Sequence, residues 1–316
     1  MNIQHILVTG RLYSEFQRLQ QEFPNKQFRC IPENEVTDED YTWAEAYVAF
    51  RPTAGFHMRN IRWVHSMGAG VDAYLNHAEW KPGIPLTRTI GSMGRMIGEY
   101  CLSHILSELQ HHSLFMDQQA GRQWVPKAPR HLKDQHVLIF GTGTIGQGIA
   151  QTLSPLGVKV TGVSRGGSLK PFFTRVAPLA ELDDLLPHVN WIINAMPLTL
   201  ETERFFNASF FRRWKSNYAD QRYFINVGRG RSVVEEELLL ALKQGWLHKA
   251  ILDVCEQEPL PGESALWPHP GVILTPHISA ITDPQEAVVE FIRTLQAVEQ
   301  GRVAELPNLV QIDRGY

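Results

Sequence analysis

The sequence has little of what marks secreted, membrane-spanning or nucleic-acid-binding proteins. Its three cysteines (Cys30, Cys101 and Cys255) lie far apart and form no CxxC pair, so neither a disulfide framework nor a zinc site is predicted. No apolar run approaches the roughly 20 residues of a membrane span, and the N-terminus shows no signal-peptide pattern. With 30 Lys plus Arg against 33 Asp plus Glu, no charge excess favours nucleic acid or a membrane surface. These absences favour a protein of the reducing cytoplasm without metal, nucleic-acid or membrane partners.

The chain instead shows a regular alternation of strand-like and helix-like patterns. Its 316 residues are enough for about two domains, and the alternation is typical of parallel βαβ construction. In the first third the predicted strands cover 5–10, 46–50, 61–67 and 84–89. A second series covers 136–140, 158–164, 191–196, 223–228, 250–254 and 272–277. Because the second series consists of near-continuous apolar runs, it predicts a doubly wound parallel sheet that is buried on both faces.

A glycine-rich stretch, GTGTIG (141–146), begins the loop after the first strand of the second series. The pattern GxGxxG is weak by itself, but here it follows an apolar strand and opens a helix, which is the context of dinucleotide binding. The first glycine permits a tight turn, the second lets the backbone approach the pyrophosphate, and the third lets helix and strand pack closely. The residues assigned to this contact are Gly141, Gly143, Thr144, Ile145 and Gly146.

The residue that ends the next strand discriminates between the two nicotinamide cofactors. NAD enzymes usually place an acid there for the ribose 2′-hydroxyl. In this chain Ser164 is followed by Arg165, with no Asp or Glu nearby in the sequence. A carboxylate would repel a 2′-phosphate, whereas a hydroxyl and a guanidinium can bind one. We therefore predict NADPH as the cofactor, with NADH as a weaker alternative; a solvated Arg165 is the competing interpretation.

Three segments of the second half each follow a predicted strand, where open α/β sheets collect their ligands. They are INVGRG (225–230), LDVCEQEPLP (252–261) and ILTPHISA (273–280). Reduction of a 2-keto acid requires an anchor for the carboxylate and carbonyl and a proton donor for the developing alkoxide. Arg229 can be the anchor, and His277 can donate the proton. Glu258 can accept a hydrogen bond from the other imidazole nitrogen and favour the protonated ring.

In order and spacing these segments resemble the signature of the D-isomer-specific 2-hydroxyacid dehydrogenase family. The resemblance runs from GAGVD (68–72) through NAMPLTLET (194–202) to TPHISA. It implies the family's catalytic Arg, Glu and His at Arg229, Glu258 and His277. The segments SMGRMIGEY and ISAITDPQEAV resemble the bacterial glyoxylate/hydroxypyruvate reductase A group, which implies reduction of glyoxylate to glycolate and of hydroxypyruvate to D-glycerate.

The same resemblance implies further contacts with cofactor and substrate. For the cofactor these are Met196 and Pro197 at the adenosine, Thr202 near the phosphates, Val227 near the nicotinamide and Asp253 at its amide. For the substrate they are Ala69 and Gly70 through their backbone N–H groups, Phe50 and Arg51 as the other wall, and Arg229 and His277. Asp253 as a helix or loop cap and Arg51 as a solvated residue are the alternatives.

The glycine turn lies in mid-chain, which predicts that one domain is inserted into another. Residues 94–124 are apolar at helical spacing and are expected to form a long bridging helix, and an amphipathic helix (285–299) is expected to pack back on the N-terminal unit. We predict a discontinuous, smaller flavodoxin-like α/β substrate domain, 1–98 plus 284–316, with a Rossmann-type domain, 99–283, inserted into it. The two crossings suit hinge closure over a substrate cleft.

Partners and alternatives follow from the same resemblance. The family dimerises through the cofactor domain, and the stretch from Leu114 to Trp124 is compatible with a homodimer; it could equally be core. A dehydrogenase for a larger 2-keto acid would use the same triad of Arg, Glu and His. A nucleotide-sensing, corepressor-like binding protein is the alternative outside enzymes, although no extra docking segment is recognisable.

Overall fold

The chain divides into two compact units in a computed structural model that describes residues 1–215 and 221–315. The first unit consists of Met1–Gly91 and Ile281–Tyr316, and the second of Ser92–Ala280. The first division falls before the expected residue 98, because helix α4 (Met93–Leu109) belongs entirely to the second unit. The second division falls at 280, three residues before the expected 283. Each unit contains one parallel sheet.

The first unit is built on a five-stranded sheet of order β2-β1-β3-β4-β5. Its strands are β1 (His5–Val8), β2 (Gln27–Cys30), β3 (Ala46–Ala49), β4 (Trp63–Ser66) and β5 (Leu86–Arg88). Strand β2 was not predicted, because it is an edge strand whose side chains are at most half-buried and its sequence therefore lacks a strong apolar run. All strand pairs are parallel.

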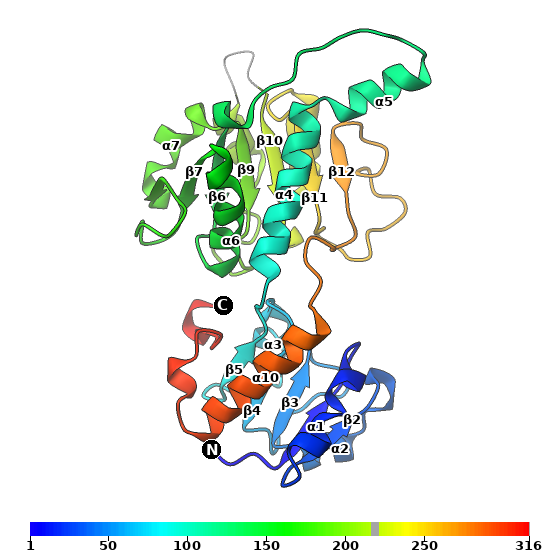
Figure 1. Cartoon of the computed structure of the whole chain (residues 1–316), viewed down its shortest axis with the longest axis vertical. Helices are drawn as coiled ribbons and strands as arrows, with labels where there is room; N and C mark the ends of the chain where they lie inside the picture. Colours follow the sequence, from blue (N-terminus) through cyan, green and yellow to red (C-terminus); the bar gives the residue numbers. More distant parts are fainter. Residues whose placement is uncertain (216–220, 316) are drawn as a thin grey trace. The chain divides into compact units, whose positions relative to one another are not determined.

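Both faces of this sheet are covered. Helix α10 (Pro284–Glu299) lies across one face (Figure 1), where its Phe291 packs with Phe16 and Trp63. The short helices α1 (Leu19–Glu22), α2 (Asp38–Trp43) and α3 (Asp72–Leu75) complete the unit. Burial on both faces explains why the central strands read as continuous apolar runs rather than as alternating patterns.

The second unit is built on a seven-stranded parallel sheet of order β12-β11-β10-β9-β6-β7-β8. Its strands are β6 (His136–Phe140), β7 (Lys159–Val163), β8 (Arg175–Ala177), β9 (Trp191–Asn194), β10 (Tyr223–Asn226), β11 (Lys249–Leu252) and β12 (Val272–Leu274). The edge strand β8, only three residues long, was not predicted. The helices are α4, α5 (His112–Ala120), α6 (Thr144–Leu153), α7 (Leu182–Leu185), α8 (Ala208–Trp214) and α9 (Glu235–Lys243). This is the doubly wound arrangement expected from the sequence.

The long helix expected over 94–124 is interrupted. Helix α4 ends at Leu109, and His111 adopts a left-handed conformation with φ of 58° before α5 begins. Helix α4 buries Ile97, Cys101 and Ile105 against the sheet, whereas α5 buries no residue. The expectation of one continuous helix is therefore wrong, because left-handed backbone cannot continue a right-handed helix.

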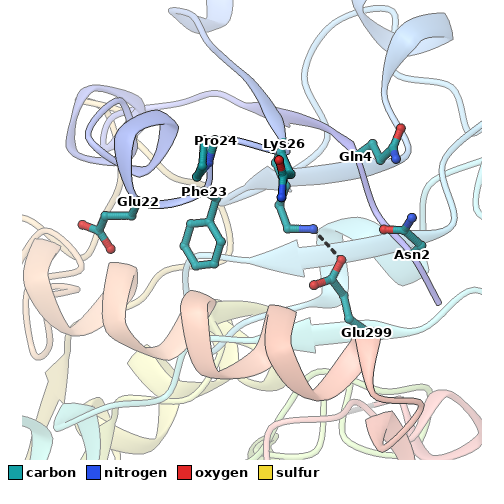
Figure 2. A pocket seen from close by; sticks show the side chains of 8 residues that line it. Asn2, Gln4, Glu22, Phe23, Pro24, Lys26 and Glu299 are labelled. Carbon is teal, nitrogen blue, oxygen red and sulfur yellow. Dashed lines mark hydrogen bonds and ion pairs between the residues drawn. The ribbon is translucent and has the colours of Figure 1, made fainter.

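The amino-terminal edge of the first sheet carries a hollow of about 450 Å³, shown in Figure 2. Lys26 and Glu299 form an ion pair beside it, and the Lys26 ammonium also donates to the Ile3 carbonyl at 2.7 Å. The pair links the start of β2 to the end of α10, and the hydrogen bond to Ile3 adds the segment before β1. Ligands of parallel sheets gather at the opposite, carboxyl edge, so we assign this hollow no catalytic role.

Candidate active site

The carboxyl ends of four neighbouring strands in the second unit lie level with one another. The register aligns Phe140 with Asn194, Asn194 with Asn226, and Asn226 with Leu252. The residues that follow these strands therefore emerge at one edge of the sheet. In this way the fold brings together the glycine turn, the loop after Asn194, the Arg229 turn and the loop that starts at Asp253.

The glycine turn has the geometry that a dinucleotide requires. Gly141 has φ of +93°, and a Cβ there would lie 2.7 Å from the Ala195 carbonyl oxygen. A Cβ on Gly146 would lie 1.9 Å from the Gly141 carbonyl oxygen, so the turn and the first turn of α6 are in backbone contact. A Cβ on Gly143 would meet nothing within 4 Å. Gly143 and Thr144 are exposed at the start of α6, where free N–H groups and the helix dipole favour a pyrophosphate.

The Arg229 turn is held by a network of buried polar side chains. The Asn194 amide donates to Asn226 Oδ1 at 2.9 Å and to Ser232 Oγ at 2.7 Å. Asn226 Nδ2 and Ser232 Oγ both donate to the Arg229 carbonyl oxygen, at 3.1 and 2.6 Å. Because Asn194, Asn226 and Ser232 are fully buried, the network fixes the backbone from which the Arg229 side chain extends.

The His277 ring and the Glu258 carboxylate form a direct pair. His277 Nδ1–H donates to Glu258 Oε2 at 2.8 Å, which leaves Nε2 as the other ring nitrogen. Both side chains are about half exposed. The Cys255 N–H donates to Glu258 Oε1 at 3.1 Å and so orients the carboxylate. The Arg229 turn is next to this loop, because a Cβ on Gly230 would lie 1.8 Å from the Cys255 carbonyl oxygen.

The pair shifts the pKa values of both partners in the direction that keeps the ring charged. The hydrogen bond to Glu258 raises the pKa of His277, against an opposing effect of burial and of the Arg229 charge. For Glu258, burial raises the pKa, but the hydrogen bond and charge of His277, together with the Cys255 N–H and the Arg229 charge, outweigh burial and the pKa is lowered. The arrangement therefore stabilises an imidazolium beside a carboxylate, which is the state of a proton donor.

Asp253 organises the loop that carries His277. Its carboxylate, 1% exposed, accepts from Thr275 Oγ1 at 2.6 Å, from the Ile278 N–H at 2.8 Å and from the Ser279 N–H at 2.9 Å. The Asp253 carbonyl accepts from the His277 N–H at 2.8 Å, and His277 itself has φ of 55°. Asp253 thus has the loop-capping contacts that the alternative interpretation expected, and its contact with a nicotinamide amide stays a prediction.

The predicted 2′-phosphate residues follow β7. Ser164 is half-buried and Arg165 is exposed. The sequence showed no acid near them, but the fold brings Glu201, from the loop after β9, within 2.5 Å of the Arg165 guanidinium. The interpretation of Arg165 as a merely solvated residue is therefore incomplete, because its side chain has an ionic partner.

The other residues predicted at the cofactor follow β9 and β10. Met196 and Pro197 are half-buried, and the Met196 N–H donates to Asn194 Oδ1 at 3.1 Å. The Thr202 hydroxyl donates to the Pro197 carbonyl at 2.6 Å and so closes this loop. Val227 is buried, and its N–H donates to the Asn194 carbonyl at 3.1 Å.

The residues predicted at the substrate follow strands of the first unit. Phe50 and Arg51 follow β3, and Ala69 and Gly70 lie in the loop after β4. The Arg11 guanidinium lies 4.2 Å from the centre of the Phe50 ring, and Arg51 is 3.6 Å from a Glu33 carboxylate oxygen. All four thus lie at the carboxyl edge of their own sheet, where a parallel sheet binds ligands.

Sequence reasoning missed the residues that support the site from within. Asn194 and Asn226 each place a polar side chain at the end of an otherwise apolar strand, and that departure from the pattern was the available sign. Ser232 lies in the turn after β10 and had no such sign. Glu201 also had no such sign, because its partner Arg165 lies in the loop after a different strand. No group of three or more His, Cys, Asp or Glu side chains in the described part of the chain is placed to hold a metal ion. Within the same residues no helix has both the length and the apolar composition to cross a membrane.

Comparisons with known proteins identify the family of the chain. The family described as D-isomer specific 2-hydroxyacid dehydrogenase, NAD binding domain, matches residues 102–279. The glyoxylate/hydroxypyruvate reductase A of Enterobacter sp. (strain 638) is 36% identical over 281 residues, which are 86% of each chain. The chain therefore belongs to the D-isomer-specific 2-hydroxyacid dehydrogenase family.

Solved structures resemble the whole fold. The NADPH-dependent glyoxylate/hydroxypyruvate reductase of Sinorhizobium meliloti, in complex with NADP and sulfate, has a TM-score of 0.89 at 28% identity and covers 99% of this chain and 100% of its own. A D-isomer specific 2-hydroxyacid dehydrogenase of Xanthobacter autotrophicus Py2, in complex with NADPH and MES, has a TM-score of 0.87 at 28% identity with the same coverage.

Proposed function

We propose that the protein reduces small 2-keto acids with NADPH, converting glyoxylate to glycolate and hydroxypyruvate to D-glycerate. The observation that carries the proposal is the His277–Glu258 pair beside the Arg229 turn, at the sheet edge that also holds the glycine turn. The similarity to glyoxylate/hydroxypyruvate reductase A supports the choice of substrate.

Each residue of the site has its own role in the proposed reduction. When bound, NADPH supplies the hydride to the carbonyl carbon of the substrate. Arg229 binds the substrate carboxylate and polarises the carbonyl through charge-assisted hydrogen bonds. His277 donates the Nε2 proton to the carbonyl oxygen as it becomes an alkoxide, and Glu258 keeps the ring oriented and protonated until that transfer. Phe50, Arg51, Ala69 and Gly70 belong to our proposed substrate contacts.

The preference for NADPH rests on the end of β7. Ser164 and Arg165 offer a hydroxyl and a guanidinium, which match the oxygens and charge of a 2′-phosphate. Two structural relatives contain NADP or NADPH. Met196, Pro197, Thr202, Val227 and Asp253 complete the proposed cofactor contacts, and NADH is expected to bind more weakly.

A direct assay tests this function. Oxidation of NADPH and of NADH is followed by absorbance with glyoxylate, hydroxypyruvate, pyruvate and phenylpyruvate. We expect the highest kcat/KM with glyoxylate or hydroxypyruvate and NADPH. Absence of turnover with all four keto acids would refute the proposed activity, and a preference for NADH would refute the assignment of Ser164 and Arg165.

We also propose that the protein is a homodimer through its second unit. Figure 1 shows α5 and the segment after it extended away from the sheet of that unit. This arm exposes Met116, Trp124 and Val125, with Trp124 97% exposed, and such apolar groups are typical of an interface. Sedimentation analysis should give a dimer for the wild type and a weaker dimer for Trp124→Ser. A monomeric wild type at all accessible concentrations would contradict the proposal.

A further inference from the structure

We propose that Glu201 is a specificity-determining residue: it is the counter-ion of Arg165 and competes with the 2′-phosphate of the cofactor for the Arg165 guanidinium. The proposal rests on the proposed use of NADPH and extends it to a residue in the loop after a different strand. The Arg165 guanidinium lies 2.5 Å from a Glu201 carboxylate oxygen, and the two side chains are 55% and 68% exposed.

The sheet order explains why these two residues meet at the cofactor site. Strand β6 lies between β7 and β9. Arg165 follows β7, Glu201 belongs to the loop after β9, and the glycine turn follows β6. The ion pair therefore joins the loops on either side of the glycine turn. The Glu201 loop is itself fixed, because the Thr202 hydroxyl donates to the Pro197 carbonyl at 2.6 Å.

The exposure of the pair decides how it responds to a phosphate. Exposed ion pairs contribute little to stability, so the Arg165 side chain can leave Glu201 at small cost. A phosphate monoester near pH 7 carries about −1.5 to −2 charges and three acceptor oxygens, and a guanidinium binds such a group with two parallel hydrogen bonds. The 2′-phosphate thus replaces the carboxylate as the partner of Arg165.

The same exchange leaves the Glu201 carboxylate near a second anion. Binding of a 2′-phosphate then loses the Arg165–Glu201 attraction and adds a like-charge repulsion, whereas a ligand with only a 2′-hydroxyl has no dianion to repel. Glu201 therefore weakens binding of phosphorylated ligands selectively and narrows the preference for NADPH over NADH.

Calorimetric titration with nicotinamide-free probes tests this directly. The probes are 2′,5′-ADP, which carries the 2′-phosphate, and 5′-AMP, which does not. We expect Glu201→Gln to tighten 2′,5′-ADP binding by about three- to tenfold and to leave 5′-AMP binding unchanged. Glu203→Gln is the matched control, because Glu203 lies two positions further along and pairs with Arg231 instead. This control should bind both probes like the wild type.

Two further variants separate this proposal from the proposed cofactor preference. Arg165→Gln should weaken 2′,5′-ADP binding, and adding Glu201→Gln to it should restore less affinity than the same change gives in the wild type. Unchanged or weaker 2′,5′-ADP binding in Glu201→Gln, or equal tightening of 5′-AMP, would overturn the role of Glu201. If Arg165→Gln leaves 2′,5′-ADP binding unchanged, the assignment of Arg165 to the 2′-phosphate is wrong, and the role of Glu201 is wrong with it. Melting temperatures equal to the wild type show that each variant is folded.

Discussion

At the scale of single residues, the candidate site depends on buried polar groups that are already hydrogen-bonded within the protein. Asp253 accepts a hydrogen bond from the loop that carries His277. Asn226 donates one to the turn that carries Arg229, and Asn194 in turn donates to Asn226. A buried polar group without a partner is costly, so each of these contacts restricts the loop to one conformation. The reacting side chains are consequently held in position before any substrate binds.

The proton donor can be removed without disturbing this support. In His277→Ala the backbone contacts of residue 277 to Asp253 remain. We expect kcat for keto-acid reduction to fall by about 10²- to 10⁴-fold, with the Kd for NADPH unchanged by fluorescence titration. A loss of NADPH binding would show that His277 has a different role.

The partner of the histidine sets the pH range of the reaction. The hydrogen bond to Glu258 raises the pKa of His277, so the donor stays protonated above the usual range and reduction is lost only as pH rises through that raised value. In Glu258→Gln the pKa of His277 should fall, and the alkaline limb of kcat/KM for reduction should move to lower pH. The nearby Glu256→Gln is the control, and an equal shift in it would argue against a specific pair.

At the scale of elements, two helices of the second unit are in backbone contact. A Cβ on Gly148 of α6 would lie 2.4 Å from the Gly94 carbonyl carbon of α4. A Cβ on Gly98 would lie 2.3 Å from Thr152 Oγ1. Small residues therefore let α4 pack directly on the helix whose N-terminus faces the predicted phosphate site, and the position of α6 depends on that packing.

Two glycine substitutions should separate packing from cofactor binding. Gly148→Ala forces α4 and α6 apart, and we expect the free energy of unfolding to fall by about 1 to 3 kcal/mol in urea titration. Gly143→Ala places its Cβ in open space. We expect it to leave the unfolding midpoint unchanged but to weaken NADPH binding, because backbone approach to the pyrophosphate is blocked. The assignment would be contradicted if Gly143→Ala lowered the free energy of unfolding without affecting NADPH binding, and Gly148→Ala weakened NADPH binding without affecting stability.

The elements that were predicted correctly from the sequence are those whose formation depends on residues close together in the chain. Buried central strands such as β6 and β10 consist mostly of apolar residues, and the glycine turn after β6 has a specific pattern. The edge strands β2 and β8 were missed because an edge strand needs fewer apolar side chains. The break at His111 was missed because its left-handed conformation leaves no mark in the apolar spacing of the residues around it.

The same distinction applies to the site. Arg229, Glu258 and His277 each end or follow a strand in a recognisable segment, so the sequence could suggest them and the structure places Glu258 against His277. Glu201 could not be suggested, because its contact with Arg165 exists only once β6 has been placed between β7 and β9. Local motifs can thus be recognised from the sequence alone. Contacts between loops that follow different strands can be recognised only when the strand order is known.

At the scale of the whole molecule, two buried histidines make stability depend on pH. Burial lowers the pKa of His65 to about 3 and, together with the Lys159 charge, that of His136 to about 4. Both rings are neutral in the fold and accept protons on unfolding below about pH 6.5. The contribution of these two groups to the free energy of unfolding is therefore fully present above that pH and is lost as pH falls toward 4 and then 3.

Urea titrations between pH 7 and pH 4 should show this loss. Each histidine contributes a slope of at most about 1.4 kcal/mol per pH unit. His65→Gln should flatten the dependence while lowering stability at pH 7, because the hydrogen bonds of the ring to Thr87 and Thr89 are disturbed. A dependence in the variant as steep as in the wild type would show that His65 is not one of the groups involved.

The position of α10 determines when the first unit can finish folding during synthesis. Phe291 and Leu295 of α10 share one core with Phe16, Val48 and Trp63 of the first sheet. The ribosome releases these early strands first and the covering helix last, after the whole second unit has emerged. The nascent first sheet therefore keeps an apolar face uncovered while Ser92–Ala280 is made. Chaperones that bind exposed apolar segments should consequently contact the N-terminal strands during translation and leave them once α10 has been released.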